Sequence, residues 1–215
     1  NGSIINNVVT TNYSNAIIVS GSGSNNNLIS NNNATSAVSA IFIVSGSNNT
    51  LIGNKGNSSA TAVWNGAGLQ LSTTVDNILM NNTWLSASYA LTLNNADNNS
   101  FIDDAATSSA GTAILFNLES DNNTFTRQDV VSQTSIGVDF SESSNTLFRD
   151  SNISGASTDV VITFDAGSLN NTFLNCSYDS ETINSGDGEI IRKWYYRAYA
   201  NYSNGAFASG VNVTA

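Results

Sequence analysis

The side chains that could do chemistry are few, and those that recur at a regular spacing are Asp103, Arg127, Arg149 and Asp150. Carboxylates beside an Arg or Lys are groups that transfer protons in enzymes acting on polysaccharides. An Asp and an Arg on neighbouring strands also make an ordinary surface ion pair, and Asp150 would offset the repulsion between the two arginines. We favour this cross-strand ion network and predict that the chain has no catalytic residue and is not an enzyme.

The composition excludes most familiar active sites. The chain has 215 residues with no His, no Pro and one Cys, Cys176. These absences exclude a Ser-His-Asp triad, a Cys-His pair, the usual zinc sites and an intrachain disulfide. Carboxylates gather at Asp187-Gly188-Glu189, but no calcium-loop motif appears. We therefore predict no metal and no cofactor, with calcium as a minor alternative.

The charge balance bears on partners. Six Lys and Arg against 16 Asp and Glu give a net charge of −10, which disfavours nucleic acid and anionic membranes as partners. The longest apolar runs, such as Ala40 to Val44, are too short to span a bilayer. Because the sequence starts at Asn1, we expect a processed form or an excerpt.

An internal repeat organises the chain. Two Asn-like residues, a small residue and an apolar pair recur, and the last apolar residue serves as an anchor. Successive anchors lie 19 to 28 residues apart with a mean of about 23, the period of a solenoid. The anchors are Val9, Leu28, Leu51, Leu79, Phe101, Phe125, Leu147 and Phe173.

A second apolar segment lies seven to nine residues before most anchors and reads as a short strand, as Leu91-Thr92-Leu93 does. No window has a helical period. We therefore predict an all-β fold, a single-stranded parallel β-helix of about eight rungs over residues 1–189. Residues 190–215 are predicted to form a C-terminal strand or hairpin extension that acts as a cap or a subunit joint.

The residue two places before every anchor is Asn, which predicts a ladder of stacked amides with a structural role. Amides in register satisfy one another's hydrogen bonds and fix the strand register. The predicted ladder consists of Asn7, Asn26, Asn49, Asn77, Asn99, Asn123, Asn145 and Asn171.

The Asn-Asn-Thr-Phe and Asn-Asn-Thr-Leu rungs, with their preceding Ile and Leu strands, resemble the NosD-like, pectate-lyase-type right-handed β-helix repeats of archaeal surface proteins, methanogens especially. The resemblance covers residues 1 to 180 and implies secretion to the cell surface. Residues 190–215 are similar to the segment by which such proteins enter an Ig-like module, so the resemblance implies that this extension is the start of one. A copper-related role does not carry over, because soft and imidazole ligands are lacking.

Acceptor sequences for N-glycosylation are frequent, and Asn48, Asn98, Asn122 and Asn170 share one slot beside the predicted ladder. This slot predicts a line of glycans along a solvent-facing corner. The candidate sites are Asn12, Asn33, Asn48, Asn57, Asn81, Asn98, Asn122, Asn152, Asn170, Asn175 and Asn201.

The repeat begins at Ile4-Ile5 and the chain ends in an aromatic segment, so we expect sticky ends that favour head-to-tail contacts. The predicted function is a structural, extracellular subunit of an archaeal surface layer, sheath or filament. Its predicted partners are further copies of itself and cell-surface glycans. A fragment of a carbohydrate-binding adhesin is the alternative, and a polysaccharide lyase or hydrolase ranks third.

Overall fold

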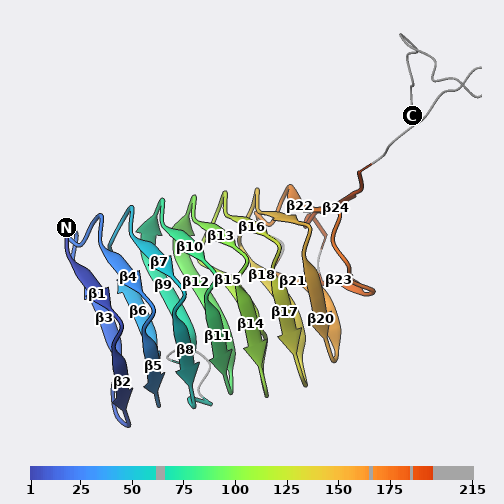
Figure 1. Cartoon of the computed structure of the whole chain (residues 1–215). Helices are drawn as coiled ribbons and strands as arrows, with labels where there is room; N and C mark the ends of the chain where they lie inside the picture. Colours follow the sequence, from blue (N-terminus) through green and yellow to red (C-terminus); the bar gives the residue numbers. More distant parts are fainter. Residues whose placement is uncertain (62–65, 165–166, 185, 196–215) are drawn as a thin grey trace, which may run out of the picture.

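The computed structural model describes residues 1–61, 66–164, 167–184 and 186–195, and these form a parallel β-helix (Figure 1). We call one turn, with one strand from each of three sheets, a rung. The all-β prediction of about eight rungs is confirmed. No helix in the described part of the chain has the length and apolar character needed to cross a membrane.

The strands are short and fall into sheets A, B and C, each with all neighbours parallel. Sheet A holds β1 (Ser3–Ile5), β4 (Leu28–Ser30), β7 (Thr50–Ile52), β10 (Ile78–Met80), β13 (Ser100–Ile102), β16 (Thr124–Thr126), β19 (Leu147–Arg149), β22 (Asn171–Leu174) and β24 (Ile190–Lys193). Sheet B holds β2 (Val8–Thr11), β5 (Asn33–Ser36), β8 (Lys55–Ser58), β11 (Thr83–Ser86), β14 (Ala105–Ser108), β17 (Asp129–Ser132) and β20 (Asn152–Gly155). Sheet C holds β3 (Ile17–Ser20), β6 (Ile41–Val44), β9 (Ala67–Val75), β12 (Tyr89–Asp97), β15 (Ile114–Asn117), β18 (Ile136–Ser141), β21 (Thr158–Phe164) and β23 (Glu181–Ile183).

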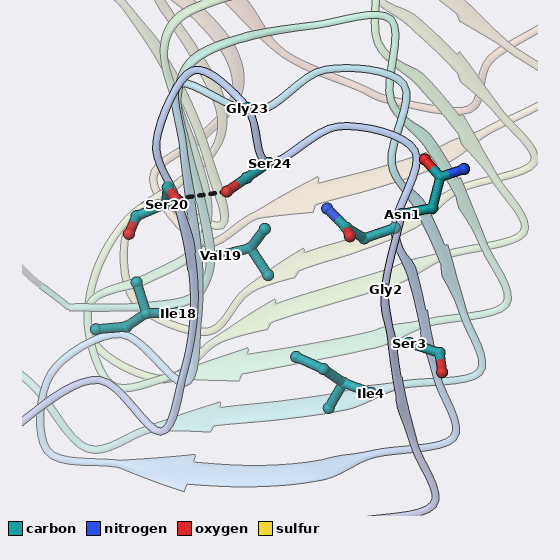
Figure 2. Close-up of a pocket in the computed structure, with 10 residues that line it drawn as sticks. Asn1, Gly2, Ser3, Ile4, Ile18, Val19, Ser20, Gly23 and Ser24 are labelled. Atoms are coloured by element: carbon teal, nitrogen blue, oxygen red, sulfur yellow. Dashed lines mark hydrogen bonds between the residues drawn. The ribbon is translucent and has the colours of Figure 1, made fainter.

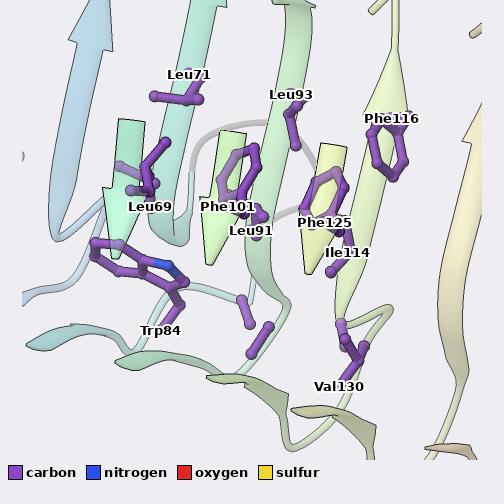
Figure 3. Packing of buried hydrophobic residues seen from close by; sticks show 14 of the residues in the cluster. Leu69, Leu71, Trp84, Leu91, Leu93, Phe101, Ile114, Phe116, Phe125 and Val130 are labelled. Carbon is purple, nitrogen blue, oxygen red and sulfur yellow. The ribbon is translucent and has the colours of Figure 1, made fainter. Parts of the chain in front are cut away.

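The core is a narrow column that receives every second side chain of each strand, as the period of two in a strand requires. Sheet A contributes a stack of phenylalanines, with ring centroids 4.3 Å apart between Phe101 and Phe125 and 4.5 Å between Phe125 and Phe148. Leu91 and Leu93 of sheet C and Trp84 of sheet B face this stack (Figure 3). Apolar side chains in register thus bury the interior continuously from rung to rung.

The corner between sheets C and A contains the asparagine ladder. The backbone and side-chain N–H groups of Asn27, Asn49, Asn77 and Asn99 donate to Oδ1 of the ladder Asn on the next rung, at 2.8 to 3.1 Å. Asn123 receives the last of these bonds. Thr146 replaces Asn on the following rung, where its backbone N–H donates to Oδ1 of Asn171 at 3.2 Å.

The predicted ladder needs correction at three positions. Asn26 and Asn145 occupy the preceding corner position, with left-handed φ angles of 57° and 58°, so their neighbours Asn27 and Thr146 take the ladder position. Asn7 lies at a different corner altogether, between sheets A and B.

The misplacement of Asn26 and Asn145 has one cause, the choice of the inward-facing anchor. Leu28 and Leu147 point outward, whereas Ile29 and Phe148 are fully buried and pair with Leu51 and Phe125 of the neighbouring rungs. An apolar pair does not reveal which member faces the core, and a one-residue error moves every side chain to the other face.

A second ladder, which the sequence did not predict, runs along the corner between sheets A and B. Asn7, Asn32, Asn54 and Asn82 each donate backbone and side-chain N–H groups to the next rung, and Asp104 accepts from Asn82 at 2.6 and 3.0 Å. This corner always has two residues between its strands. The first usually adopts a left-handed backbone, which Asn tolerates best among residues with a side chain.

Asp104 is an acidic residue in an amide position. Its Oδ2 and the Nε1 of Trp84 are both buried and have no hydrogen-bond partner of normal geometry, although the Trp84 side chain is near enough to lower the pKa of the carboxyl. Burial raises the pKa of Asp104 to about 7, although the hydrogen bonds from Asn82 favour the ionised form. At neutral pH this carboxyl is therefore divided between its acid and carboxylate forms, and the acid form resembles the amide that it replaces.

The predicted domain boundary at residue 189 stays a prediction, because the structure describes only the first part of the predicted extension. β24 pairs with β22 and extends sheet A to Lys193. Arg192 lies 3.8 Å above the Tyr178 ring and makes an ion pair of 3.0 Å with Glu181, which together cover the end of the core. The rest of the predicted extension, residues 196–215, lies outside the described residues.

We expect Asn99→Ala to lower the free energy of unfolding by roughly 2 to 4 kcal/mol, because the N–H groups of Asn77 lose their buried acceptor. Urea denaturation measures this change. Asn57→Ala, at an exposed position of β8, is the control and should stay within about 0.5 kcal/mol. Equal effects of the two substitutions would mean that the ladder contributes nothing to stability.

We expect Asp104→Asn to remove a pH dependence of stability. The raised pKa means that the folded chain holds a proton that the unfolded chain releases above about pH 4. Stability therefore falls as pH rises from about 4 to about 7, by on the order of 4 kcal/mol in total. The variant, whose amide would donate as Asn82 does, should unfold at a higher temperature than the parent at pH 8. If the melting temperatures of the parent and of the variant changed with pH in parallel, the raised pKa of Asp104 would be contradicted.

Candidate functional site

The predicted ion network is partly in place on the corner between sheets A and B. Arg127 Nε and Nη2 donate to the two carboxylate oxygens of Asp103 at 2.6 and 2.7 Å. This hydrogen bonding lowers the pKa of Asp103. Both side chains are well exposed, and solvent weakens ion pairs of this kind.

Arg149 is not in the column that the sequence predicted. It ends β19 in register with Thr126, and its Nη2 donates to the Thr126 hydroxyl at 3.3 Å. Asp150 takes the corner position after Arg127 and accepts from the side chain of Asn175 at 2.7 Å. The one-residue shift that misplaced Asn145 also explains this difference. The four charged residues therefore form no enclosed cluster.

The candidate glycosylation residues of the described part are all exposed, and Asn201 lies outside it. Asn48, Asn98, Asn122 and Asn170 share one corner and one left-handed backbone conformation, with φ between 55° and 57°. The next residue in each case is a buried ladder Asn. The structure places the four side chains in one exposed line, and their modification stays a prediction.

A pocket of about 460 Å³ lies at the first rung, where β1 and β3 each have a neighbouring strand on one side only (Figure 2). Ile4, Val19 and Ser24 line it, and the Ser24 hydroxyl donates to the Ser20 carbonyl at 2.5 Å. No charged side chain lines the pocket. It opens onto the apolar interior at the first described rung, and its side chains offer no group for acid or base chemistry.

The side chain best suited to chemistry is Asp139, on the outer face of sheet C. Its neighbours in β18, Val138 and Phe140, are fully buried in the core, so Asp139 points outward. On the adjacent strands it is in register with Leu115 and Val161, which are 7% and 4% exposed. A carboxyl is thus held between two apolar side chains on the outside of the helix.

An irregularity in β21 brings a hydroxyl to this carboxyl. The pairing of β18 with β21 shifts between Phe140 and Ser141, which leaves Thr163 as an extra residue. The Thr163 hydroxyl donates to Oδ1 of Asp139 at 2.5 Å. β-bulges re-aim side chains in this way and are frequent next to functional sites.

The environment of Asp139 changes its acidity. Burial raises its pKa to about 6, although the hydrogen bonds from Thr163 favour the ionised form. Burial, together with the charge of Asp139, also raises the pKa of Tyr89 at the start of β12. The two groups therefore interact electrostatically, and Asp139 can take up or release a proton near neutral pH.

Asp159, also in sheet C, has a different role. It accepts from the backbone N–H groups of Gly155, Asp179 and Ser180 at 2.7 to 2.9 Å. Although burial alone would raise its pKa, these hydrogen bonds lower it below the ordinary value. Asp159 thus fastens neighbouring turns and is not available to a ligand.

The described residues contain no group of three or more His, Cys, Asp or Glu arranged to hold a metal. Within the segment considered for calcium, Glu189 accepts from the backbone N–H of Asn170 at 3.2 Å. The site on sheet C therefore consists of a carboxyl, a phenol and neutral polar side chains.

Sequence reasoning missed Asp139, Tyr89 and Thr163. Val138-Asp139-Phe140 read as an ordinary strand, and neither Tyr89 nor Thr163 belongs to a repeated column. The available signal was an acidic residue at an outward position that is apolar or neutral on the other rungs from Ile18 to Thr182.

No protein-family model and no curated protein matches the chain. Similar solved structures include the periplasmic alginate epimerase AlgG, with 10% identity, a TM-score of 0.41 and coverage of 80% of this chain and 48% of that one. The A-module of the mannuronan C-5 epimerase AlgE6 from Azotobacter vinelandii has 11% identity, a TM-score of 0.45 and coverage of 91% and 58%. The Agl-KA catalytic domain has 16% identity, a TM-score of 0.45 and coverage of 89% and 45%.

These likenesses concern the fold, and the chain spans about half the length of the structures that it resembles. They also correct the prediction that the chain is not an enzyme. Two of the similar structures are epimerases and the third is a catalytic domain, so a β-helix of this kind gives no ground for that exclusion.

We expect the carboxyl carbon of Asp139 to titrate with a midpoint near pH 6 in an NMR titration. In Asp139→Asn, the pKa of Tyr89 should fall but stay above its ordinary value, because burial remains after the charge is removed. The absorbance of the phenolate or the ring resonances report the second change. A midpoint near pH 4 for Asp139 would show that the carboxyl is solvated.

Proposed function

We propose that this chain is an extracellular β-helix that binds a polysaccharide on the outer face of sheet C. The observation that carries the proposal is Asp139, a half-buried carboxyl that faces outward and is held by the bulged residue Thr163. A carboxyl held in this way can form hydrogen bonds with a ligand, and it can transfer a proton to or from that ligand, while its own position stays fixed.

The surroundings of Asp139 suit a ligand rich in hydroxyl groups. In the same outward column, Thr92 is only 7% exposed, whereas Gln70, one rung further, is partly exposed. Asn94 is also partly exposed and accepts from the side chain of Asn117, which is 9% exposed, at 3.3 Å. Amides and hydroxyls both donate and accept, as sugar hydroxyls do. Parallel strands about 4.8 Å apart repeat these groups along the helix, so an extended polymer can contact several rungs.

Proton exchange adds a chemical capacity to binding. With a pKa of about 6, Asp139 is divided between its acid and its carboxylate forms near neutral pH. It can therefore donate a hydrogen bond to a sugar oxygen or accept one from a sugar hydroxyl. A reaction at this site would use Asp139 as its proton donor or acceptor.

We expect the purified chain to be retarded in affinity gels that contain a polysaccharide ligand, and Asp139→Asn to weaken this binding about fivefold or more. Asn keeps the shape and the oxygen that accepts from Thr163, so the fold should persist. Asp129→Asn, on the exposed outer face of sheet B, is the matched control and should bind as the parent does. Equal loss in both variants, or in neither, would refute the site.

A second proposal concerns assembly: the chain is a structural subunit of an archaeal surface layer, sheath or filament built from packed β-helical protomers. It is supported by apolar side chains around the first rung, since Val8, Tyr13 and Ile18 are 80%, 94% and 49% exposed. Each strand of this rung also has one edge without a neighbouring strand in the described residues. Edges of this kind pair readily with further strands.

If this surface joins copies of the chain, negative-stain microscopy of the purified protein should show rods that lengthen with concentration. Ile18→Ser should shorten them, because it removes an apolar contact at the joint. Ile78→Ser, at a similarly exposed position in the middle of sheet A, should leave the rods unchanged. Monomers at every concentration in light scattering would count against assembly through this surface.

A further inference from the structure

The positive charges of the described chain avoid sheet C. Lys55 is in sheet B, Arg127 is at the corner between sheets A and B, and Arg149, Arg192 and Lys193 are in sheet A. No strand of sheet C contains a Lys or an Arg. The absence of Lys and Arg is therefore a property of the strands of sheet C, and the negative net charge of the chain does not by itself explain it.

Several acidic residues, in contrast, lie in sheet C or in the turns that lead out of it, although Asp103, Asp129 and Asp150 lie elsewhere. Asp97 ends β12 and Asp139 lies in β18, while Glu119 and Asp121 follow β15. Asp97 and Glu119 raise the pKa of Asp121 further, beyond the effect of its own burial, so the negative charges act on one another. None of the described Lys and Arg residues lies in a strand of sheet C, so this sheet and the turns after it carry negative charges without a cation of their own.

The cation closest in the fold to this sheet is already engaged. Arg192 makes its ion pair of 3.0 Å with Glu181 and donates to the Tyr178 hydroxyl at 2.8 Å, where it covers the end of the core. It is therefore held at the last rung, away from the outer column of Thr92, Leu115 and Asp139.

From this arrangement we infer that the polysaccharide bound by sheet C is neutral, and that uronic-acid polymers are rejected. The inference rests on the proposed binding function and names its ligand class. A polyuronate has one carboxylate on each sugar and would meet like charge on this face with no Lys or Arg to pair with it. A neutral glycan needs only the hydroxyl, amide and carboxyl groups that the face supplies.

The same reasoning specifies how binding responds to salt. Attraction between opposite charges weakens as salt screens it, whereas hydrogen bonds to neutral hydroxyls are much less sensitive. Neutral-glycan binding should therefore change less than about twofold between 50 and 500 mM NaCl. Chelator should have no effect either, since the described residues contain no cluster of three or more His, Cys, Asp or Glu arranged to hold a metal.

The test compares a neutral β-glucan with alginate and polygalacturonate of similar length, by affinity gel electrophoresis and calorimetry of the full chain, with calcium and with chelator. We expect neutral glucan to bind at least about tenfold more tightly than either polyuronate. Asn94→Lys should raise polyuronate binding, because it places a cation on the outer face of sheet C. Asn57→Lys adds the same charge to sheet B and is expected to have no effect.

The outcomes separate the two proposals. Polyuronate binding by the parent chain that equals or exceeds glucan binding, and that Asp139→Asn weakens, overturns the inference and leaves the proposed function standing. A gain from Asn57→Lys as large as that from Asn94→Lys also overturns it, because the charge of sheet C would then not decide the ligand. Absence of binding to every polysaccharide refutes the proposed function and this inference with it.

Discussion

The structure depends on satisfying the buried polar groups at the corners of a narrow solenoid. Each rung must turn where sheets meet, and a turn leaves backbone and side-chain N–H groups that strand pairing does not use. In the two ladders, one Oδ1 accepts both N–H groups of the preceding rung, as Asn99 does for Asn77. Because each rung supplies the acceptor for its neighbour, register and hydrogen bonding are fixed together, and the phenylalanine stack follows from that register.

The same constraint accounts for the unusual members of the ladders. Thr146 keeps only the backbone bond to Asn171, and its own hydroxyl is buried without a partner. Asp104 fits an amide position because burial raises its pKa to about 7, so that its acid form is still well populated at neutral pH. A ladder therefore tolerates an occasional residue other than Asn. Such a residue makes only some of the hydrogen bonds that Asn would make, and the local stability then depends on pH, as at Asp104, or on packing, as at Thr146.

The sequence was sufficient for the fold because the fold is repeated. An Asn-rich motif that recurs eight times made the period clear even where a single copy was ambiguous, and it located strands such as Leu91 to Leu93. Prediction from the sequence failed where the orientation depended on one rung alone, as at Leu28 and Leu147, because either member of an apolar pair could face the core. The site on sheet C could not be predicted for the opposite reason. Asp139 interrupts its column once, and the bulge at Thr163 arises only when β18 pairs with β21.

The connections between the sheets also differ in length. Between sheets A and B there are always two residues, whereas from sheet B to sheet C the connection ranges from two residues after β11 to eight after β8. Lengthening the first corner would break the second ladder, but lengthening the other displaces no ladder member. Divergent or engineered descendants of this chain can therefore acquire loops beside sheet C while the scaffold stays unchanged. The face proposed to hold the ligand is thus bordered by the connections that are freest to evolve.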